Sequence, residues 1–281
     1  MKQRIEKLGA SGRNFTQIVM ELAINRGYAV QTAQRMVAAV LDHDGNQLQL
    51  LRSQTEGEYP DIDTSMEHNW ITLADARIGI AMEQLAPRMV LLDNFLSDKE
   101  CDALCDYARD HLESATVHVE DHANGELLRD IRRSDVTSLP QEQFPLISVI
   151  EHRIEALTGW PQACGEPLQI QRYGVNGKYE PHYDFFLNDT AYYEKEMTQG
   201  GQRLATLIVY LQQPERGGAT YMANLGIRVM PRKGSALFFS YPQATRQSGT
   251  LHGGDPVHSG EKWIMTKWFR EKTDDTSAGT P

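Results

Sequence analysis

The chain has few cysteines, and their number argues against a fold held together by disulfide bonds. Only Cys101, Cys105 and Cys164 occur in 281 residues. An odd and sparse set of this kind does not form a disulfide framework. Cys101 and Cys105 are four residues apart in a predicted helix, so they share one face. We expect them to be small buried residues rather than a redox pair.

Basic residues are fewer than acidic ones in this chain. The chain has 38 acidic and 28 basic residues, which gives a formal net charge of -10. Proteins that bind nucleic acid gain affinity when Lys and Arg neutralise phosphates, so this balance argues against a nucleic-acid partner. It equally disfavours docking on an anionic membrane surface.

Long hydrophobic runs are absent. The first residues, MKQRIEKLGASGRNF, lack the apolar centre of a signal peptide. No stretch reaches the roughly 18 apolar residues that a membrane-spanning helix needs. We therefore expect a cytoplasmic protein with no membrane partner. Hydrophobic residues still make up 40% of the chain, which is enough for a substantial core.

The first 86 residues predict an appendage and a connecting segment. Residues 1–50 are expected to form a helical hairpin, with one helix capped by Asn14 and a second beginning near Val30. Such a small hairpin buries little by itself. It is a stabilising appendage, a dimer contact or a substrate platform. Residues 52–70 are polar and rich in turn residues. We therefore assign residues 51–86 to a linker or a cover for the next domain.

From about Met89 the pattern predicts a strand and two helices. MVLLDNFLS is typical of a buried strand, and the segment after it begins a helix at Ser97 with Glu100 in the capping-box position. FPLISVIEHRIEALTG predicts a second helix that ends at Gly159.

After Pro167 most segments predict strands. LQIQRYG and YEPHYDFF flank VNGK, which is a hairpin-turn signal, and GIRVM and SALFFSY flank PRKG, which predicts another turn. RLATLIVYLQ predicts a central buried strand, and EKWIMTKWFRE predicts the last one. Many short strands with Gly and Pro turns favour an antiparallel sandwich or barrel. The tail 272–281 is expected to be disordered.

The stretch YEPHYDFF places His182 and Asp184 two residues apart. On an extended strand, residues i and i+2 point to the same face, so these two side chains are expected to converge. Two histidines and one carboxylate on one face of a metal form the arrangement of non-haem Fe(II) oxygenases. The third ligand would come from later in the chain, where His252 and His258 are the alternatives. Each of these residues, taken alone, is also typical of an ordinary core or loop position.

A lysine accompanies this set. Lys262 follows His252 by ten residues, within a segment that predicts a buried strand. A buried lysine needs an anionic partner. An oxygenase that uses a 2-oxo acid needs a cation for the distal carboxylate of that acid, and Lys262 is suited to that role.

From about Met89 to Glu271, the sequence resembles the prolyl 4-hydroxylase branch of the Fe(II)/2-oxoglutarate-dependent dioxygenases, in its bacterial type. The segments that carry the resemblance, in the family's order and roughly its spacing, are RYGVNGKYEPHYDFF, GGQRLATLIVYL, ERGGATYM, VMPRKGSALFF and LHGGDPVHSGEKWIMTKW. The resemblance implies a mainly β fold with flanking helices. Its catalytic domain is a double-stranded β-helix (jelly roll), assigned to residues 87–271, and a small N-terminal helical segment precedes it.

The resemblance also assigns residues to the site. Those that match the family's iron ligands are His182, Asp184 and His252. Those that match positions holding 2-oxoglutarate are Lys262, which pairs with the C5 carboxylate, and Tyr173 and Thr220. Those that match positions linked to the peptide substrate or lining the site are Arg203, Tyr179 and Trp268. The sequence departs from the family at two positions. TYMANLG lacks the Phe-Pro often seen after this threonine, near the pocket rim, and Arg270 stands where some eukaryotic members have a substrate-contacting histidine.

The activity implied is hydroxylation of a peptidyl proline, with release of succinate and CO2. The cofactors implied are Fe(II), 2-oxoglutarate, O2 and ascorbate, and the partner is a protein or peptide that contains proline. A homodimer is a further expectation. One alternative keeps the chemistry and changes the substrate to a free amino acid or another small molecule. A second is a metal-binding jelly roll without turnover, and a third, disfavoured by the acidic balance, is a nucleic-acid demethylase.

Overall fold

The computed structural model divides the chain into two compact units, Met1–Glu58 and Tyr59–Pro281. In the first unit the structure describes residues 2–11, 13, 17–19, 21–22 and 37. In the second it describes residues 59–65, 68–115, 132–139, 144–188 and 193–273. No described helix combines the length and the hydrophobicity that crossing a membrane requires.

The N-terminal unit begins with helix α1, Lys2–Ala10, which the sequence pattern did not predict. The described residues of the predicted hairpin, at 17–19, 21–22 and 37, are helical, and the rest of it lies outside the described residues. A small apolar core joins these segments, and its members are Ile5, Ile18, Val19, Leu22 and Val37. The predicted disordered tail also lies outside the described residues, apart from its first two positions.

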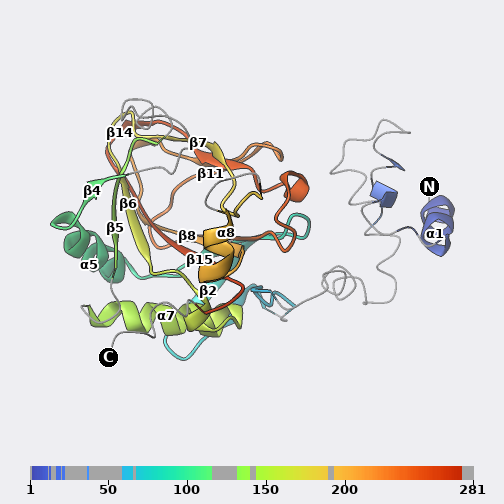
Figure 1. The fold of residues 1–281 in the computed structure, drawn as a ribbon, viewed down its shortest axis with the longest axis horizontal. Coiled ribbons are helices and arrows are strands. Elements are labelled where there is room, and N and C mark those ends of the chain that lie inside the picture. Colours follow the sequence, from blue (N-terminus) through green and yellow to red (C-terminus); the bar gives the residue numbers. More distant parts are fainter. Residues whose placement is uncertain are drawn as a thin grey trace. The chain divides into compact units, whose positions relative to one another are not determined.

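The second unit is built on antiparallel sheets, as the strand pattern predicted (Figure 1). The strands of the nine-stranded sheet are, in spatial order, β1 (Trp70–Thr72), β2 (Arg77–Gln84), β3 (Met89–Asp93), β12 (Ala236–Ser240), β8 (Arg203–Gln212), β15 (Lys262–Arg270), β6 (Gln169–Tyr173), β5 (Asp135–Ser138) and β4 (Glu113–Ser114). Those of the four-stranded sheet are β11 (Ile227–Val229), β10 (Thr220–Met222), β13 (His252–Gly254) and β7 (Tyr179–His182). A two-stranded ribbon pairs β14 (Val257–Ser259) with β9 (Arg216–Gly217).

The main sheet starts earlier in the chain than the sequence indicated. Strands β1 and β2 both lie within residues 51–86, the segment that the sequence assigned to a linker or a cover, and β2 pairs with β3. The compact unit accordingly begins at Tyr59 rather than at residue 87. These strands lie at the edge of the sheet, where much of their surface is half-buried or exposed, so they lack the continuous apolar run that indicates a buried strand.

Two helices pack on the large sheet, on the side opposite the four-stranded sheet (Figure 1). Helix α5 (Asp98–Arg109) begins with the predicted capping box between Ser97 and Glu100. Helix α7 (Pro145–Thr158) ends at Gly159, whose φ of 66° is the left-handed conformation that glycine adopts without strain. Cys101 and Cys105 are buried on α5 and unpaired, as predicted. A short helix, α8 (Tyr193–Gln199), lies between β7 and β8 in the sequence.

Side-chain alternation along β8 and β15 creates two cores. Trp263, Met265 and Phe269 point toward the helices and join the larger core. Ile264, and Ile208 of β8, point the other way into a second core between the two sheets. Because successive side chains on a strand face opposite sides, Lys262 and Thr206 are also directed into the space between the sheets.

The hairpin predicted at VNGK is wrong, and the turn predicted at PRKG likewise joins strands of different sheets. VNGK connects β6, which pairs with β5 and β15, to β7, which pairs with β13 in the other sheet. PRKG likewise connects β11 of the small sheet to β12 of the large one. Both segments do turn the chain, and Asn176 has a φ of 63°. The turn residues were identified correctly, but in this topology the chain passes between sheets at these points.

Candidate metal centre and co-substrate pocket

His182 and His252 are brought together by strand pairing. They are direct Cα partners across the antiparallel pair β7–β13, although 70 residues separate them in the chain. Residues opposite each other in such a pair have Cβ atoms about 5 Å apart. The two imidazole centroids accordingly lie 4.4 Å apart. His258, the alternative ligand, is exposed on β14 and does not belong to the cluster.

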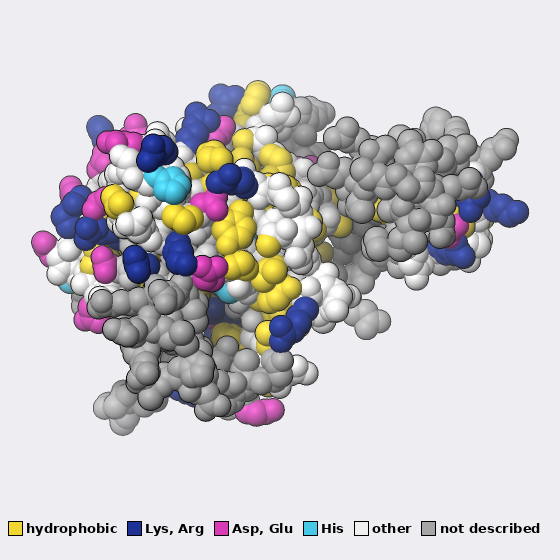
Figure 2. Space-filling model, turned by 90° about the horizontal axis from the view of Figure 1, so that it is seen from above, with side chains coloured by type: hydrophobic (Ala, Val, Ile, Leu, Met, Phe, Trp, Pro, Cys, Tyr) yellow, Lys and Arg dark blue, Asp and Glu magenta, His cyan; other side chains and the backbone are white. Residues whose placement is uncertain are grey.

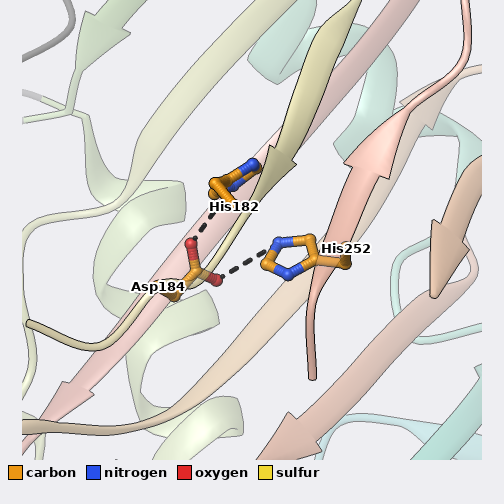
Figure 3. A group of neighbouring side chains, drawn as sticks. All are labelled: His182, Asp184 and His252. Carbon is orange, nitrogen blue, oxygen red and sulfur yellow. Dashed lines mark ion pairs between the residues drawn. The ribbon is translucent and has the colours of Figure 1, made fainter. Parts of the chain in front are cut away.

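Asp184 completes the cluster from just beyond the end of β7, not from the strand itself. Figure 3 shows its carboxylate between the two imidazoles. The Oδ1 atom lies 3.5 Å from Nε2 of His182, and the Oδ2 atom lies 3.5 Å from Nε2 of His252. The expected convergence is therefore present, but the reason differs from the simple strand alternation, because the chain has left the sheet at this point.

Backbone carbonyls fix both imidazoles in the same tautomer. The Nδ1 atom of His182 is 2.9 Å from the carbonyl oxygen of Glu180, and that of His252 is 2.9 Å from the carbonyl oxygen of Thr250. Because a carbonyl only accepts hydrogen bonds, each Nδ1 carries the proton. Each Nε2 therefore offers its lone pair to the space that the other two side chains face.

The charges within the cluster suit a divalent cation. Burial lowers the pKa of His252 to about 4, so its imidazole is neutral at neutral pH. Burial alone would raise the pKa of Asp184, but the neighbouring His252, His182 and Arg203 outweigh it and hold that pKa below its usual range. Asp184 is thus an anion, and the Nε2 atoms of both histidines face its carboxylate.

These residues fit a non-haem iron. Their ligand atoms all lie within 4.8 Å of one another, and they are the only three-residue set of His, Cys, Asp and Glu with this geometry among the described residues. Two imidazoles and one carboxylate on one face are the donor set of Fe(II) oxygenases, with the remaining positions open.

Lys262 lies deep in the same inter-sheet space. It is 3% exposed, and burial lowers its pKa to about 7. Its Nζ atom is 3.3 Å from Oγ1 of Thr220, which also accepts a hydrogen bond from the Tyr210 hydroxyl at 2.9 Å. Within the described part of the chain, no carboxylate lies within 4.0 Å of Nζ. A buried ammonium without an anionic partner is the expected state of a residue whose partner is an anionic ligand.

Aromatic rings surround this lysine. Nζ of Lys262 lies 5.6 Å from the ring centroid of Tyr173 and 5.8 Å from that of Tyr210. Tyr173 is directly opposite Lys262 in the β15–β6 pair, and its hydroxyl donates to Gln171 at 2.8 Å. The structure thus places Tyr173 and Thr220 around the Lys262 ammonium, together with Tyr210, which the sequence pattern did not single out.

The residues assigned to the peptide substrate lie elsewhere around the cluster. Tyr179 stacks on His182, with ring centroids 3.7 Å apart. Trp268 is half-buried, and its ring lies 4.2 Å from the guanidinium carbon of Arg203. The guanidinium of Arg203 bonds to Glu166 and to the backbone of Asp184 rather than projecting outward.

Sequence reasoning missed the groups that hold Asp184. The Thr206 hydroxyl donates to Oδ2 of Asp184 at 2.6 Å and lies 2.8 Å from the Tyr241 hydroxyl. Both Thr206 and Tyr241 are almost completely buried. A signal was present, because Thr206 is a polar residue inside the otherwise apolar strand RLATLIVYLQ.

The cluster is open on one side only. The side chain of His182 is 22% exposed, whereas those of Asp184 and His252 are 6% and 5% exposed. Figure 2 shows the face of the molecule that bears β7, β11 and β14. A band of hydrophobic side chains crosses it, and Lys and Arg alternate there with Asp and Glu. The described part of this face is therefore not a continuous basic surface of the kind that a polyanion requires.

Three comparisons with known proteins point to one family. A model described as the 2OG-Fe(II) oxygenase superfamily matches residues 168–270, which include all three cluster residues and Lys262. Probable prolyl 4-hydroxylase 7 of Arabidopsis thaliana is 38% identical over 208 residues, which cover 66% of this chain and 64% of that protein. Prolyl 4-hydroxylase 5 of the same plant is 37% identical over 204 residues, 65% of this chain and 68% of the relative.

A solved structure agrees with these relatives. It is the viral collagen prolyl hydroxylase of Paramecium Bursaria Chlorella virus-1 in complex with 2OG, with a TM-score of 0.51 and 31% sequence identity. The match covers 65% of this chain and 95% of that one. The described jelly-roll architecture is therefore one that a 2OG-binding protein is known to use.

Proposed function

Because the chain belongs to the prolyl 4-hydroxylase family of 2OG-Fe(II) oxygenases, we propose that it hydroxylates a proline residue within a peptide or protein. Iron would be held by His182, Asp184 and His252, and 2-oxoglutarate by Lys262. When bound, the iron and 2-oxoglutarate together activate O2 for the hydroxylation of an unactivated C–H bond, with release of succinate and CO2. Ascorbate is proposed as the reductant that sustains turnover.

The observation that carries this proposal is the buried, unpaired Lys262 beside the His/Asp/His cluster. A protein that merely bound a metal would gain nothing from an ammonium that costs stability and has no carboxylate partner among the described residues. The distal carboxylate of a 2-oxo acid supplies that partner, and the Thr220 hydroxyl provides a second polar contact. This feature separates the oxygenase from the alternative of a non-catalytic jelly roll.

The site has a buried end and a solvent-exposed end. At the buried end, Lys262 and Thr220 orient the co-substrate and the surrounding aromatic rings exclude water. At the open end, His182 and the stacked Tyr179 are reached from outside. Because the metal ligand His182 is itself reached by solvent, a side chain that projects from a larger molecule could approach the metal. This access favours a peptidyl proline over a small molecule that is fully enclosed by the protein.

Succinate formation tests the proposal directly. The full chain, with Fe(II), O2, 2-oxoglutarate and ascorbate, is incubated with and without proline-containing peptides. We expect succinate to rise with peptide, and we expect no turnover from His182→Ala, because one of three protein ligands is lost. His258→Ala is the matched control, since that histidine is exposed and outside the cluster, and it should retain activity. Equal succinate with and without every peptide would favour the free amino acid or small-molecule substrate.

A further inference from the structure

A chain of two hydroxyl groups ends on the carboxylate of Asp184. The Oγ1 atom of Thr206 lies 2.6 Å from Oδ2 of Asp184, and the Tyr241 hydroxyl lies 2.8 Å from the same Oγ1 atom. A carboxylate only accepts hydrogen bonds, so Thr206 gives its single proton to Asp184. Tyr241 must therefore be the donor to Thr206. The chain has one direction, from the phenol through the threonine to the carboxylate.

The two distances agree with this direction. Hydroxyl donors lie about 2.5–2.7 Å from a charged carboxylate oxygen, and bonds between neutral hydroxyls are about 2.7–2.8 Å long. Hydrogen bonds in series polarise one another. The phenol of Tyr241 therefore strengthens the bond from Thr206 to Asp184, although Tyr241 and Asp184 share no hydrogen bond themselves.

The main chain fixes the position of Thr206. This residue lies within β8, opposite Phe239 of β12 on one side and Trp268 of β15 on the other. It is completely buried. Because strands pair with β8 on both sides, the hydroxyl of Thr206 is carried by one of the most constrained positions of the sheet.

The Tyr241 side chain is held just as closely. Tyr241 follows the last residue of β12, and its backbone N–H still donates to the carbonyl oxygen of Leu204 on β8 at 2.8 Å. Its ring is buried, with centroids 5.4 Å from that of Phe185 and 6.1 Å from that of Phe239. The phenol is thus a fixed donor behind Thr206.

Asp184 has less support of its own. It follows the last residue of β7 by two positions, outside the paired part of the strand. The terminal torsion of an aspartate side chain is broad, so a carboxylate without a hydrogen bond turns easily. The bond from Thr206 restricts this rotation and makes the two oxygens different. Among the described residues, Oδ2 accepts from a hydroxyl, whereas Oδ1 accepts from no hydroxyl or backbone N–H.

We propose that Thr206 and Tyr241 are positioning residues that fix the orientation of the Asp184 carboxylate, so that Oδ1 is the oxygen presented to the metal ion. Tyr241 acts only through Thr206. The proposal rests on the proposed function in taking Asp184 as a ligand of the metal. It explains why a threonine stands inside the otherwise apolar strand RLATLIVYLQ, where valine would fill similar space.

Metal affinity measured without peptide tests these roles. The full chain is titrated with Mn(II), and the free ion is followed by electron paramagnetic resonance. Loss of a group that orients a metal ligand typically weakens metal affinity by about 10–100-fold, and we expect that range for Thr206→Val. Tyr241→Phe leaves the threonine in place, so we expect a smaller loss of about threefold to tenfold.

The double variant shows whether Tyr241 acts through Thr206. Valine has no hydroxyl that could pass on the effect of the phenol. Adding Tyr241→Phe to Thr206→Val should therefore cause no further loss of Mn(II) affinity. Two independent disturbances of the core would instead give losses that multiply.

Two further variants serve as controls. Ser240 is next to Tyr241, and its buried hydroxyl has no hydrogen-bond partner among the described residues. Since neighbouring residues on a strand face opposite sides, Ser240→Ala removes a buried oxygen on the other face and should bind Mn(II) as the wild type does. Thr206→Ser keeps the hydroxyl and should recover most of the affinity that Thr206→Val loses.

The absorption spectrum of the Co(II)-loaded protein reports ligand geometry. We expect it to change in Thr206→Val and in Tyr241→Phe but not in Ser240→Ala. Circular dichroism establishes that each variant is folded, and Thr206→Ala takes the place of Thr206→Val should the latter not fold.

Wild-type Mn(II) affinity in folded Tyr241→Phe would overturn the proposal. A further loss when Tyr241→Phe is added to the Thr206 variant would overturn it as well. A wild type that binds Mn(II) but produces no succinate with any peptide would instead count against the proposed function.

Discussion

Replacing Lys262 by methionine should stabilise the protein in the absence of 2-oxoglutarate and destroy its ability to bind that co-substrate. Methionine keeps an unbranched side chain of similar length and removes the charge. In the wild type Lys262 is 3% exposed, and the only hydrogen bond of its ammonium among the described residues is to Thr220 at 3.3 Å. Its burial is therefore largely uncompensated until an anion binds.

The size of the effect follows from the pKa of Lys262. Burial lowers this pKa from its ordinary value of 10.5 to about 7. At about 1.4 kcal/mol for each pKa unit, the difference corresponds to a penalty on the order of 5 kcal/mol for burying the charged form. Below pH 7 the lysine is protonated in both the folded and the unfolded state, so the penalty is complete. As the pH rises from about 7 to 10.5, the folded state loses its proton first and the penalty disappears.

Binding of 2-oxoglutarate should depend on pH in the opposite direction to the stability of the protein without it. An anionic carboxylate at Nζ favours the protonated lysine, so binding of 2-oxoglutarate above pH 7 takes up a proton. Its affinity should consequently fall as the pH rises above the Lys262 pKa of about 7, by up to about tenfold per pH unit. Lys262→Met should show weak binding with no such pH dependence.

Urea unfolding followed by tryptophan fluorescence measures the stability. All four tryptophans lie in the second unit, Tyr59–Pro281, so the fluorescence reports the unfolding of that unit. They are Trp70, Trp160, Trp263 and Trp268. Mn(II) replaces iron so that 2-oxoglutarate binds without turnover. The reasoning is refuted if Lys262→Met is less stable than the wild type without 2-oxoglutarate near neutral pH, or if its affinity for 2-oxoglutarate is unchanged.

Two further substitutions separate the site from the scaffold. A Cβ atom at Gly253 would lie 2.7 Å from the carbonyl oxygen of Tyr179. Gly253→Ala should therefore push β13 away from β7 and displace the adjacent His252. A Mn(II) titration should then show weaker metal binding. Glu151 and Lys267 form an almost fully buried ion pair at 2.7 Å between α7 and β15, so Glu151→Gln should cost about 3–5 kcal/mol in urea unfolding with Mn(II) affinity unchanged. Wild-type metal affinity in the first variant, or wild-type stability in the second, would contradict these expectations.

Local signals in the sequence predicted many elements correctly. Ser97 and Glu100 fixed the start of α5 because a capping box needs only neighbours in the chain. Gly159 fixed the end of α7 for the same reason. The continuous apolar stretch of β8 indicated a strand covered on both faces, and all of its residues except the two at its ends are buried.

The residues that order the site could not be predicted in this way because their partners are distant in sequence. Glu166 and Arg203 are 37 residues apart, and neither has a neighbour that reveals the contact. Asp184 was expected on a strand face, whereas the chain leaves β7 before it and the ligand depends on Thr206 and Arg203. The pairing of His182 with His252 depends on the register of two strands, which periodicity does not give. The family resemblance supplied the choice of His252 as a ligand but not this register.

The most direct test of the central claim is the ratio of succinate to hydroxyproline. The full chain is incubated with Fe(II), O2, ascorbate, 2-oxoglutarate and a proline-containing peptide, and both products are measured in the same sample. A protein that couples 2-oxoglutarate to peptidyl proline should form one hydroxyproline for each succinate above the peptide-free level. Succinate that rises with peptide while no proline gains an oxygen atom would contradict prolyl hydroxylation and leave only the oxygenase chemistry.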